Sequence, residues 1–412
     1  MGLTTGFKNS AGKDIGSDLV EKSYLIDRYP ELADTFRFAG LWMWGRNTTG
    51  QLGDNSITLR SSPIQTVSGG TNWKNVTGVA NSSAGVKTDG TLWTWGHNGN
   101  GQLGTGSGIV HRSSPVQTAS GGTNWKLVAG GFYHIASIKT DGTLWTWGRN
   151  NVGQLGDGSS ITHRSSPIQT VSGGTNWKSV AGGTAHTAAV KTDGTLWTWG
   201  FNSDGQLGNN VDTTNRSSPI QTVSGGTNWK QVACGGSHTA AIKTDGTLWL
   251  WGNNNTFDNK GGNLGDNSLT KKSSPVQTVS GGTNWKLVAG GFYHTAAIKT
   301  DGTLWLWGSN SFAQLGDNSL TPKSSPVQTV SGGTNWKSVA CGQYHTAAIK
   351  TDGTLWLWGN NFYGILGDNT AANKSSPVQT VSGGTNWKQV SSGTNHIVSI
   401  RDNSSDIFGE SV

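Results

Sequence analysis

Hydrophobic and polar positions alternate along this chain in a unit that recurs about every fifty residues. A clear copy lies at residues 179–207. There, one alternating run ends at Lys191, residues 192–194 (Thr-Asp-Gly) have turn chemistry, and a second alternating run covers Leu196–Gly200. This pattern predicts a β-hairpin with two Trp side chains on one face. The Leu-Trp-x-Trp-Gly core of the second run begins at Leu41, Leu92, Leu144, Leu196, Leu248, Leu304 and Leu355. A fixed period of this size predicts an array of packed supersecondary units.

Each unit contains four segments with strand character. In order they are Ser-Ser-Pro-Val-Gln-Thr-Val, Trp-Lys-x-Val-Ala, His-Thr-Ala-Ala-Ile-Lys and Leu-Trp-x-Trp-Gly, and a long loop that opens with Trp-Gly-x-Asn leads to the next unit. Seven such units without an intervening helix predict an all-β fold, a seven-bladed β-propeller of four-stranded antiparallel blades over residues 41–412.

The two ends of the repeat region complement each other. It begins with a lone strand at Leu41–Gly45 and ends with a unit that has three strands and only a degraded fourth at Asp406–Gly409. We therefore expect Leu41–Gly45 to pair with His396–Ile400. Pairing of the N- and C-terminal strands would close the ring and leave no unpaired edge at that point.

Residues 1–40 lie outside the repeat and form a short N-terminal arm. Apolar residues are spaced as in a helix over residues 17–38, so we expect the arm to be partly helical. It carries five basic and six acidic residues and is therefore not a basic tail. The arm is either a cap over the first blade or a docking peptide for a larger assembly.

The formal net charge is +7, with 30 Lys and Arg against 23 Asp and Glu. Three basic positions recur in every unit and hold 21 of those 30 residues. One follows the Asn-Trp pair, another precedes Ser-Ser-Pro, and the third opens the Thr-Asp-Gly turn, where we expect it to pair with the Asp. Dispersed rings of charge predict a solvated surface and no nucleic-acid partner, because groove-binding proteins cluster their charge.

Two further classes of feature add little. No run of 18 apolar residues occurs and the N-terminus lacks a secretory pattern, so we expect neither a membrane span nor a signal peptide. Cys234 and Cys341 occupy equivalent places in two units that are not adjacent. We expect buried free thiols there, too far apart for a disulfide.

Six units carry a His at one position: His134, His186, His238, His294, His345 and His396. A zinc site needs three or four ligands around one ion, whereas equivalent positions in a ring are spread apart. We expect each imidazole to bond to backbone within its own blade. Glu is absent from residues 41–409 and most Asp residues belong to repeated turns, which disfavours a catalytic carboxylate pair. The sequence thus predicts no enzyme activity, no catalytic or metal-binding residue and no cofactor.

Two recurring motifs carry a family resemblance. Trp-Gly-x-Asn-x-x-Gly-Gln-Leu-Gly at Trp147–Gly156 and Val-Ala-Cys-Gly-x-x-His-Thr at Val232–Thr239 resemble the regulator of chromosome condensation repeat family. The resemblance covers residues 41–400 and implies a seven-bladed propeller that serves as a binding platform without a catalytic centre. Known members include an exchange factor for a nuclear GTPase, the plant ultraviolet-B photoreceptor and bacterial inhibitory proteins.

This chain departs from the first two members. The exchange factor has a basic tail, and this arm is acid-balanced. The photoreceptor places Trp in the pair of residues before the His, and none of the seven pairs here contains Trp, which argues against photoreception. The arm itself, at Tyr24–Leu32, resembles propeller proteins of marine bacteriophages and implies a virion-associated role.

The loops divide between two ends of the blades. Ser-Gly-Gly-Thr-Asn and Thr-Asp-Gly share one end, the turn face, and hardly vary between units. The Gly-x-x-His link and the long Trp-Gly-x-Asn loop share the other end, the loop face, and hold nearly all the variation. Ten aromatic residues in these variable loops are the candidate binding residues: Phe132, Tyr133, Phe201, Phe257, Phe292, Tyr293, Phe312, Tyr344, Phe362 and Tyr363. They serve either to pack the loops or to anchor a partner.

These observations favour a non-enzymatic binding and structural protein, associated with a virion as an appendage, decoration or host-recognition protein. Its expected partners are other virion proteins, through the arm, and a host surface protein or glycan. A lectin-like carbohydrate-binding module is the first alternative, and a GTPase regulator of the exchange-factor type is the second. The expected location is the virion, with the cytoplasm as the alternative.

Overall fold

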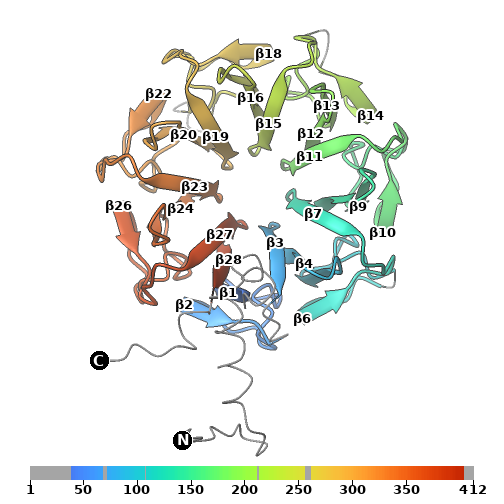
Figure 1. Cartoon of the computed structure of the whole chain (residues 1–412), viewed down its shortest axis with the longest axis horizontal. Coiled ribbons are helices and arrows are strands. Elements are labelled where there is room, and N and C mark those ends of the chain that lie inside the picture. The colour runs from blue at the N-terminus through green and yellow to red at the C-terminus, as the bar shows by residue number, and fades with distance from the viewer. Residues whose placement is uncertain (1–38, 68–71, 107, 211–212, 256–260, 403–412) are drawn as a thin grey trace, which may run out of the picture.

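The computed structural model describes residues 39–67, 72–106, 108–210, 213–255 and 261–402. These ranges contain 28 strands and no helix, arranged as seven four-stranded antiparallel blades around a central axis (Figure 1). The predicted all-β seven-bladed propeller is confirmed. Within the described ranges, no helix has the length and apolar character needed to cross a bilayer.

Each blade starts at the axis with the strand that follows Asn. The innermost strands are β3 (Trp73–Gly78), β7 (Trp125–Gly130), β11 (Trp177–Gly182), β15 (Trp229–Cys234), β19 (Trp285–Gly290), β23 (Trp336–Cys341) and β27 (Trp387–Ser392). The second strands are β4 (Ser82–Lys87), β8 (His134–Lys139), β12 (His186–Lys191), β16 (His238–Lys243), β20 (His294–Lys299), β24 (His345–Lys350) and β28 (His396–Asp402).

The Leu-Trp-x-Trp-Gly segments form the third strands, and the Pro-containing segments form the outer wall. The third strands are β5 (Leu92–Gly96), β9 (Leu144–Gly148), β13 (Leu196–Gly200), β17 (Leu248–Gly252), β21 (Leu304–Gly308), β25 (Leu355–Gly359) and β1 (Ala39–Gly45). The outermost strands are β6 (Arg112–Gln117), β10 (Arg164–Gln169), β14 (Arg216–Gln221), β18 (Lys272–Gln277), β22 (Lys323–Gln328), β26 (Lys374–Gln379) and β2 (Arg60–Gln65). Pro suits this edge position because it cannot donate to a ladder.

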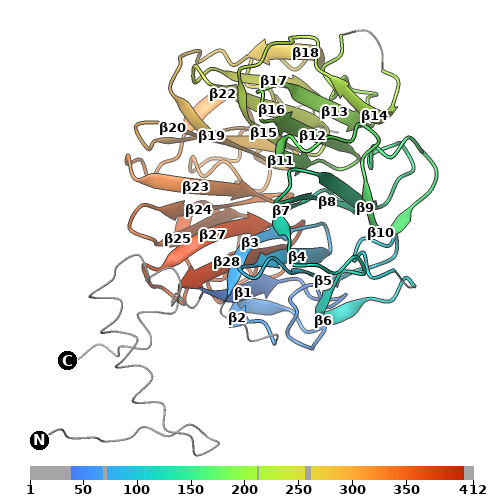
Figure 2. The ribbon, with the colours of Figure 1, turned by 45° about the vertical axis from the view of Figure 1, so that its right-hand side comes forward.

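The first and last strands of the ring share one blade, in the order β2-β1-β28-β27. Figure 2 shows the blue strands β1 and β2 beside the red strands β27 and β28. Leu41 pairs with Ile400 and Gly45 with His396, as the sequence predicts. The degraded motif at 406–409 and residues 1–38 of the arm, with its expected helix, lie outside the described residues, whereas Ala39 and Gly40 belong to β1.

The hydrophobic core lies between blades and repeats seven times. In the Leu-Trp-x-Trp-Gly strand the second Trp is fully buried, as at Trp199, because its face meets the neighbouring blade. Trp177 of the innermost strand packs edge-on against it, with ring centroids 6.2 Å apart. Ala136, Ile138 and Leu144 of the preceding blade complete that cluster. Because every blade contributes to two such clusters, the blades stabilise one another.

The Lys that opens each Thr-Asp-Gly turn lies against Trp rings. The Lys191 Nζ atom is 4.8 Å from the Trp177 ring and 4.5 Å from the Trp197 ring, a cation–π arrangement. Asp193 accepts hydrogen bonds from the Thr195 backbone N–H and hydroxyl, at 2.9 and 2.7 Å. Those bonds, with the nearby Lys191 charge, hold the pKa of Asp193 below its usual range. The expected Lys–Asp ion pair at this turn is therefore wrong, since the lysine stacks and the carboxylate caps the turn.

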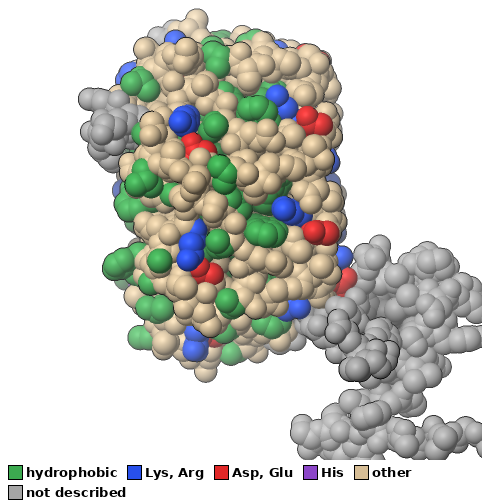
Figure 3. All heavy atoms as spheres, turned by 90° about the vertical axis from the view of Figure 1, so that its left-hand side faces the viewer, with side chains coloured by type: hydrophobic (Ala, Val, Ile, Leu, Met, Phe, Trp, Pro, Cys, Tyr) green, Lys and Arg blue, Asp and Glu red, His purple; other side chains and the backbone are tan. Residues whose placement is uncertain are grey.

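Ion pairs occur instead on the outer wall. The basic residue before Ser-Ser-Pro pairs with the Asp of the preceding Gly-Asp, as in Arg164–Asp157 at 2.7 Å and Lys374–Asp368 at 3.4 Å. Figure 3 shows neighbouring basic and acidic side chains on this wall, among scattered apolar ones. This ring of positive charge is thus largely neutralised by the protein itself.

Candidate functional site

The seven Gly-x-x-His links meet around the axis on the loop face. Each link carries one residue that hydrogen-bonds through its backbone to the link of the next blade, and together these bonds form a closed belt. The donor–acceptor pairs are Ala80–Phe132, Phe132–Gly183, Thr184–Gly236, Gly236–Gly291, Phe292–Gly342, Gln343–Thr394 and Thr394–Ala80. Because every blade is tied to its successor, the link side chains are held in fixed positions around the axis.

Two link residues meet over the axis. Phe132 belongs to the blade of β7 and Phe292 to the blade of β19, three blades further along the ring. Their ring centroids are only 5.6 Å apart in an edge-to-face contact. Both residues line a central cavity of about 450 Å³ that all seven innermost strands surround. The two rings therefore lie across the loop-face end of this cavity.

The contact extends on both sides into an aromatic band across the loop face. Tyr133 packs on Phe132 at 4.4 Å, and Tyr293 packs on Phe292 at 4.8 Å. Tyr344 then stacks on Tyr293 at 5.8 Å, and Phe312 lies 4.6 Å from Tyr344. We call these six half-buried residues the aromatic band: Phe132, Tyr133, Phe292, Tyr293, Phe312 and Tyr344.

The other four predicted residues lie apart from the band or outside the described residues. Phe362 and Tyr363 form a separate pair at 4.9 Å, and Phe362 is 71% exposed. Phe201 is half-buried at the start of its long loop. Phe257 lies outside the described residues. The loop face thus has one continuous aromatic surface through its centre and one smaller aromatic pair.

Two tyrosine hydroxyls of the band, those of Tyr293 and Tyr344, stay protonated across the physiological range. Burial, together with neighbouring Tyr344, raises the pKa of Tyr293 to about 12, and burial raises the pKa of Tyr344 as well. Each of these two phenols can therefore donate a hydrogen bond while its ring supplies apolar area. Amphipathic rings of this kind are enriched at the centres of protein interfaces and also suit the apolar faces of sugars.

Two Arg side chains and one histidine border the aromatic rings. The Arg149 guanidinium lies 5.4 Å from the Tyr133 ring centroid, and Arg46 lies at the same distance from Tyr363. His97 is 6.5 Å from Tyr133. These three residues were not among those predicted from the sequence. All three directly follow Trp-Gly, a position whose residue changes from unit to unit, and that variation is the signal that could have found them.

The buried histidines bridge blades, contrary to the expectation of backbone bonding within one blade. His186 Nε2 lies 3.0 Å from Thr239 Oγ1 in the next blade, and His238 lies 3.0 Å from Thr295 in the same way. The equivalent pairs are His134–Thr187, His294–Thr346 and His396–Ser83. His345 faces a blade with Ile397 at the hydroxyl position. Five of the six imidazoles are therefore hydrogen-bonded across a blade junction.

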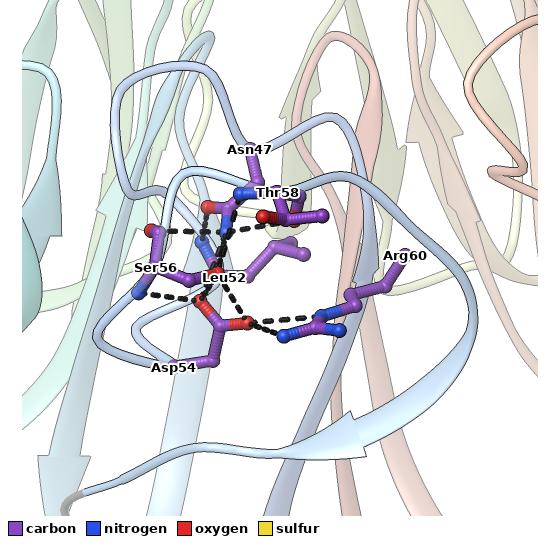
Figure 4. A network of polar contacts seen from close by, with 6 residues as sticks. All are labelled: Asn47, Leu52, Asp54, Ser56, Thr58 and Arg60. Carbon is purple, nitrogen blue, oxygen red and sulfur yellow. Dashed lines mark hydrogen bonds and ion pairs between the residues drawn. The ribbon is translucent and has the colours of Figure 1, made fainter.

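The long loops also have a structural role that their variability conceals. Figure 4 shows Asn47, whose Nδ2 donates to Asp54 Oδ1 at 2.9 Å and to the Thr58 carbonyl at 3.1 Å. Its Oδ1 accepts from the Leu52 N–H at 2.9 Å, and Asp54 also holds Arg60. This network folds the loop so that Leu52 is fully buried.

The same loop joins two blades. The Gln51 carbonyl accepts a hydrogen bond from Trp95 Nε1 of the next blade at 2.9 Å, and Asn55 donates to Ser113 in that blade's outer strand. The Gly53 carbonyl accepts from Val67, beyond the turn-face end of β2. The long loop thus leaves the loop face and runs between blades, so only its first residues belong to the candidate site.

The two cysteines line the central cavity but lie outside the aromatic band. Cys234 is buried and Cys341 is half-buried, and both are free thiols. Burial raises the pKa of each thiol, which disfavours the reactive thiolate.

Comparison with known families places most of the chain. A model of the RCC1-like domain matches residues 163–409, and two models of the regulator of chromosome condensation (RCC1) repeat match residues 89–138 and 125–154. The chain is 33% identical over 342 residues to the ultraviolet-B receptor UVR8 of Arabidopsis thaliana, covering 81% of this chain and 76% of UVR8. It is 28% identical over 321 residues to the mitochondrial RCC1 domain-containing protein RUG3 of the same plant, covering 70% of each.

Solved structures share the fold at lower identity. Yeast RCC1 (Prp20), in its complex with Kap60, superposes with a TM-score of 0.77 at 19% identity, covering 90% of each chain. Human WBSCR16 superposes with a TM-score of 0.76 at 21% identity, covering 88% of this chain and all of that one.

Proposed function

Because this chain belongs to the RCC1-like domain family, we propose that it is a non-enzymatic binding protein whose aromatic band receives a protein partner. The observation that carries this proposal is the meeting of Phe132 and Phe292 over the axis at 5.6 Å, which turns residues from distant loops into one surface. The backbone belt fixes that surface, so little conformational entropy is lost on binding.

The chemistry of the band supports a protein partner. It combines large apolar rings, protonated phenols and the Arg149 guanidinium, and aromatic and Arg side chains are the residue types enriched at interface hot spots. The histidines that would be the natural acid–base groups are buried and fixed at separate blade junctions. Binding therefore fits the site better than catalysis.

Relatives support a role in recognition. Yeast RCC1 is seen bound to Kap60, and Prp20p has binding properties to Gsp1p and histones. Those partners belong to those proteins, and we propose for this chain only the class of partner. The relatives give no support to virion association, which stays a prediction from the N-terminal arm, as does docking through that arm.

The test is a binding measurement on the full chain. A partner identified by crosslinking to the loop face is titrated against the native chain and against Tyr133→Ala and Tyr293→Ala. Each substitution is expected to weaken binding by more than ~1 kcal/mol, as truncation of an interface anchor does. The matched control is Tyr363→Ala, which removes a half-buried tyrosine that also lies beside an Arg but is outside the band.

Loss of thermal stability in both band variants with unchanged binding would overturn the proposal and make the band a packing element. A glycan array run with the same variants distinguishes protein binding from the alternative, a lectin-like carbohydrate-binding function. Specific sugar binding that depends on Tyr133 and Tyr293, without a protein partner, would favour the lectin-like function.

A further inference from the structure

A ring of lysines surrounds the axis on the turn face, opposite the aromatic band. Each of the seven innermost strands carries one at its second position: Lys74, Lys126, Lys178, Lys230, Lys286, Lys337 and Lys388. We call these the lysine ring. All seven are exposed. Since Trp73 pairs with Lys87 beside the Thr-Asp-Gly turn, the start of each innermost strand lies on the turn face.

A β-bulge presents each of these lysines. Pairing with the second strand jumps from Trp73 to Asn75, and the same irregularity recurs at the equivalent Lys in every blade. A bulge leaves one residue outside the regular ladder and re-aims its side chain. The repeated bulge therefore turns seven ammonium groups toward solvent around the axis end of the strands.

The position keeps its lysine without any packing requirement. The residue that follows varies between blades and is half-buried: Asn75, Leu127, Ser179, Gln231, Leu287, Ser338 and Gln389. Repeats that have diverged at that partly packed site could diverge more easily at the exposed one. The uniform lysine therefore points to a requirement for the charge itself.

The charge of this ring is also the least neutralised of the three basic rings. The basic residues before Ser-Ser-Pro on the outer wall pair with Asp, as in Arg60–Asp54 at 2.9 Å. The lysines that open the Thr-Asp-Gly turns, such as Lys191, stack on Trp rings beside the turn Asp. Among the described residues, Lys388 is the only member of the lysine ring that forms an ion pair, with Asp402 at 3.7 Å. Like charges around one mouth raise the local potential and attract anions.

A cavity continues from this ring along the axis. Asn75, Gln231 and Gln389, each directly after a ring lysine, are among the residues that line the central cavity of about 450 Å³. That volume lies in the range of small-molecule sites. At the opposite end lie Phe132 and Phe292, so the cavity mouth on the turn face is the one bordered by positive charge.

We propose that the lysine ring and the cavity mouth bind a compact, phosphate-rich anion on the propeller axis. A compact anion placed on the axis faces all seven ammonium groups at once, whereas an extended polymer crossing a ring meets only some of them. Lysine binds phosphate as a point charge. Every described Phe and Tyr lies in the links and long loops, and the half-buried Trp rings beside the turns, such as Trp197, lie against the turn lysines, so the turn face offers no free ring for stacking nucleic-acid bases. This site is independent of the aromatic band.

The test uses inorganic tripolyphosphate as the probe and calorimetric titration of the full chain. The triple variant Lys126→Gln, Lys230→Gln, Lys337→Gln removes three charges from alternate parts of the ring. Its affinity is expected to fall about tenfold, since each exposed ion contact changes affinity by a few-fold. The matched control Arg112→Gln, Lys271→Gln, Lys323→Gln removes the same charge from the outer wall and is expected to keep its affinity within about twofold.

The outcomes are distinct. An equal loss in both triple variants would show a non-specific effect of net charge and overturn the proposal. Absence of tripolyphosphate binding to the native chain would overturn it as well. An oligo-glutamate peptide and single-stranded DNA are titrated as well. If either binds more tightly than tripolyphosphate and loses affinity in the lysine-ring variant, the ligand is a macromolecule and the compact-anion proposal is wrong. Protection of Lys126 and Lys230 from chemical acetylation by bound tripolyphosphate, with Lys271 unprotected, would support the site directly.

Discussion

Phe132 and Phe292 are 160 residues apart in the sequence, yet their rings meet edge-to-face over the propeller axis with centroids 5.6 Å apart. The contact joins loops from opposite sides of the ring and lies next to the belt of backbone hydrogen bonds. It therefore couples two blades that share no sheet and no core cluster.

This coupling is measurable. In a double-mutant cycle with Phe132→Leu and Phe292→Leu, we expect a coupling of ~0.5–1.5 kcal/mol in the free energy of unfolding, the size found for aromatic pairs. Urea denaturation of the native chain, both single variants and the double variant gives this value. Additive effects of the two substitutions would show that the rings do not stabilise each other.

Stability should fall steeply in mild acid. Burial lowers the pKa of His134 and His238 to about 4 and that of His186, His294, His345 and His396 to about 3. The pKa of each histidine is lower in the folded chain than its value of about 6.5 in the unfolded chain. The free energy of unfolding is therefore highest above about pH 6.5 and falls as the pH drops below that value. In that range each histidine lowers the free energy of unfolding by up to ~1.4 kcal/mol per pH unit.

Urea unfolding between about pH 7.5 and pH 4.5 checks this, and the slope counts the protons taken up. The turn carboxylates do not interfere, because Thr hydrogen bonds hold their pKa values below the usual range. A free energy of unfolding that stays constant down to about pH 5 would contradict the burial of neutral imidazoles.

The stacked lysines should matter more for stability than the exposed ones. Lys191→Met keeps the aliphatic stem but removes the cation between Trp177 and Trp197, and we expect a loss of ~0.5–2 kcal/mol. Lys178→Met, at an exposed position on the strand next to it, should change the free energy of unfolding by less than ~0.5 kcal/mol. Thermal melts of both variants decide this, and equal effects would mean that the stacking contributes nothing.

The closing strand should be indispensable, and most of the arm should not. Deleting residues 1–45 removes β1, whose Leu41, Met43 and Trp44 are fully buried, and leaves β28 paired only with β27. We expect a loss of more than ~5 kcal/mol, a large part of a domain's net stability. Deleting residues 1–30 should leave the melting temperature unchanged. Calorimetry of the two truncated chains provides the test, and a fully stable chain without residues 1–45 would contradict the shared blade.

The ring, its blade number and its closure could be predicted from the sequence because the Trp motif repeats in register and the two end strands complement each other. The histidine partners could not be predicted in the same way. Thr239 lies 53 residues after His186, and the repeat shows that both recur but not that one blade's strand faces the other's. That relation depends on how neighbouring blades pack.

The candidate site could be predicted only in part from the sequence. The aromatic residues and their face could be identified from the sequence, but whether Phe132 meets Phe292 depends on the diameter of the ring, which no local pattern contains. The turn lysine was misjudged because Lys191 and Asp193 are close in sequence. In the folded turn the Asp faces Thr195, while the lysine stem lies along Trp rings one strand away on either side.

The shared blade also sets how the molecule responds to a mechanical load. Ala39 pairs with Asp402, so the two ends of the ring leave the sheet side by side at the same edge. Tension applied between these two residues loads one cross-strand pair at a time. Strands β1 and β28 therefore separate sequentially, from Ala39 toward Gly45. Tension between any two other blades is carried by many inter-blade contacts in parallel, so the ring should open first at the seam where it was closed.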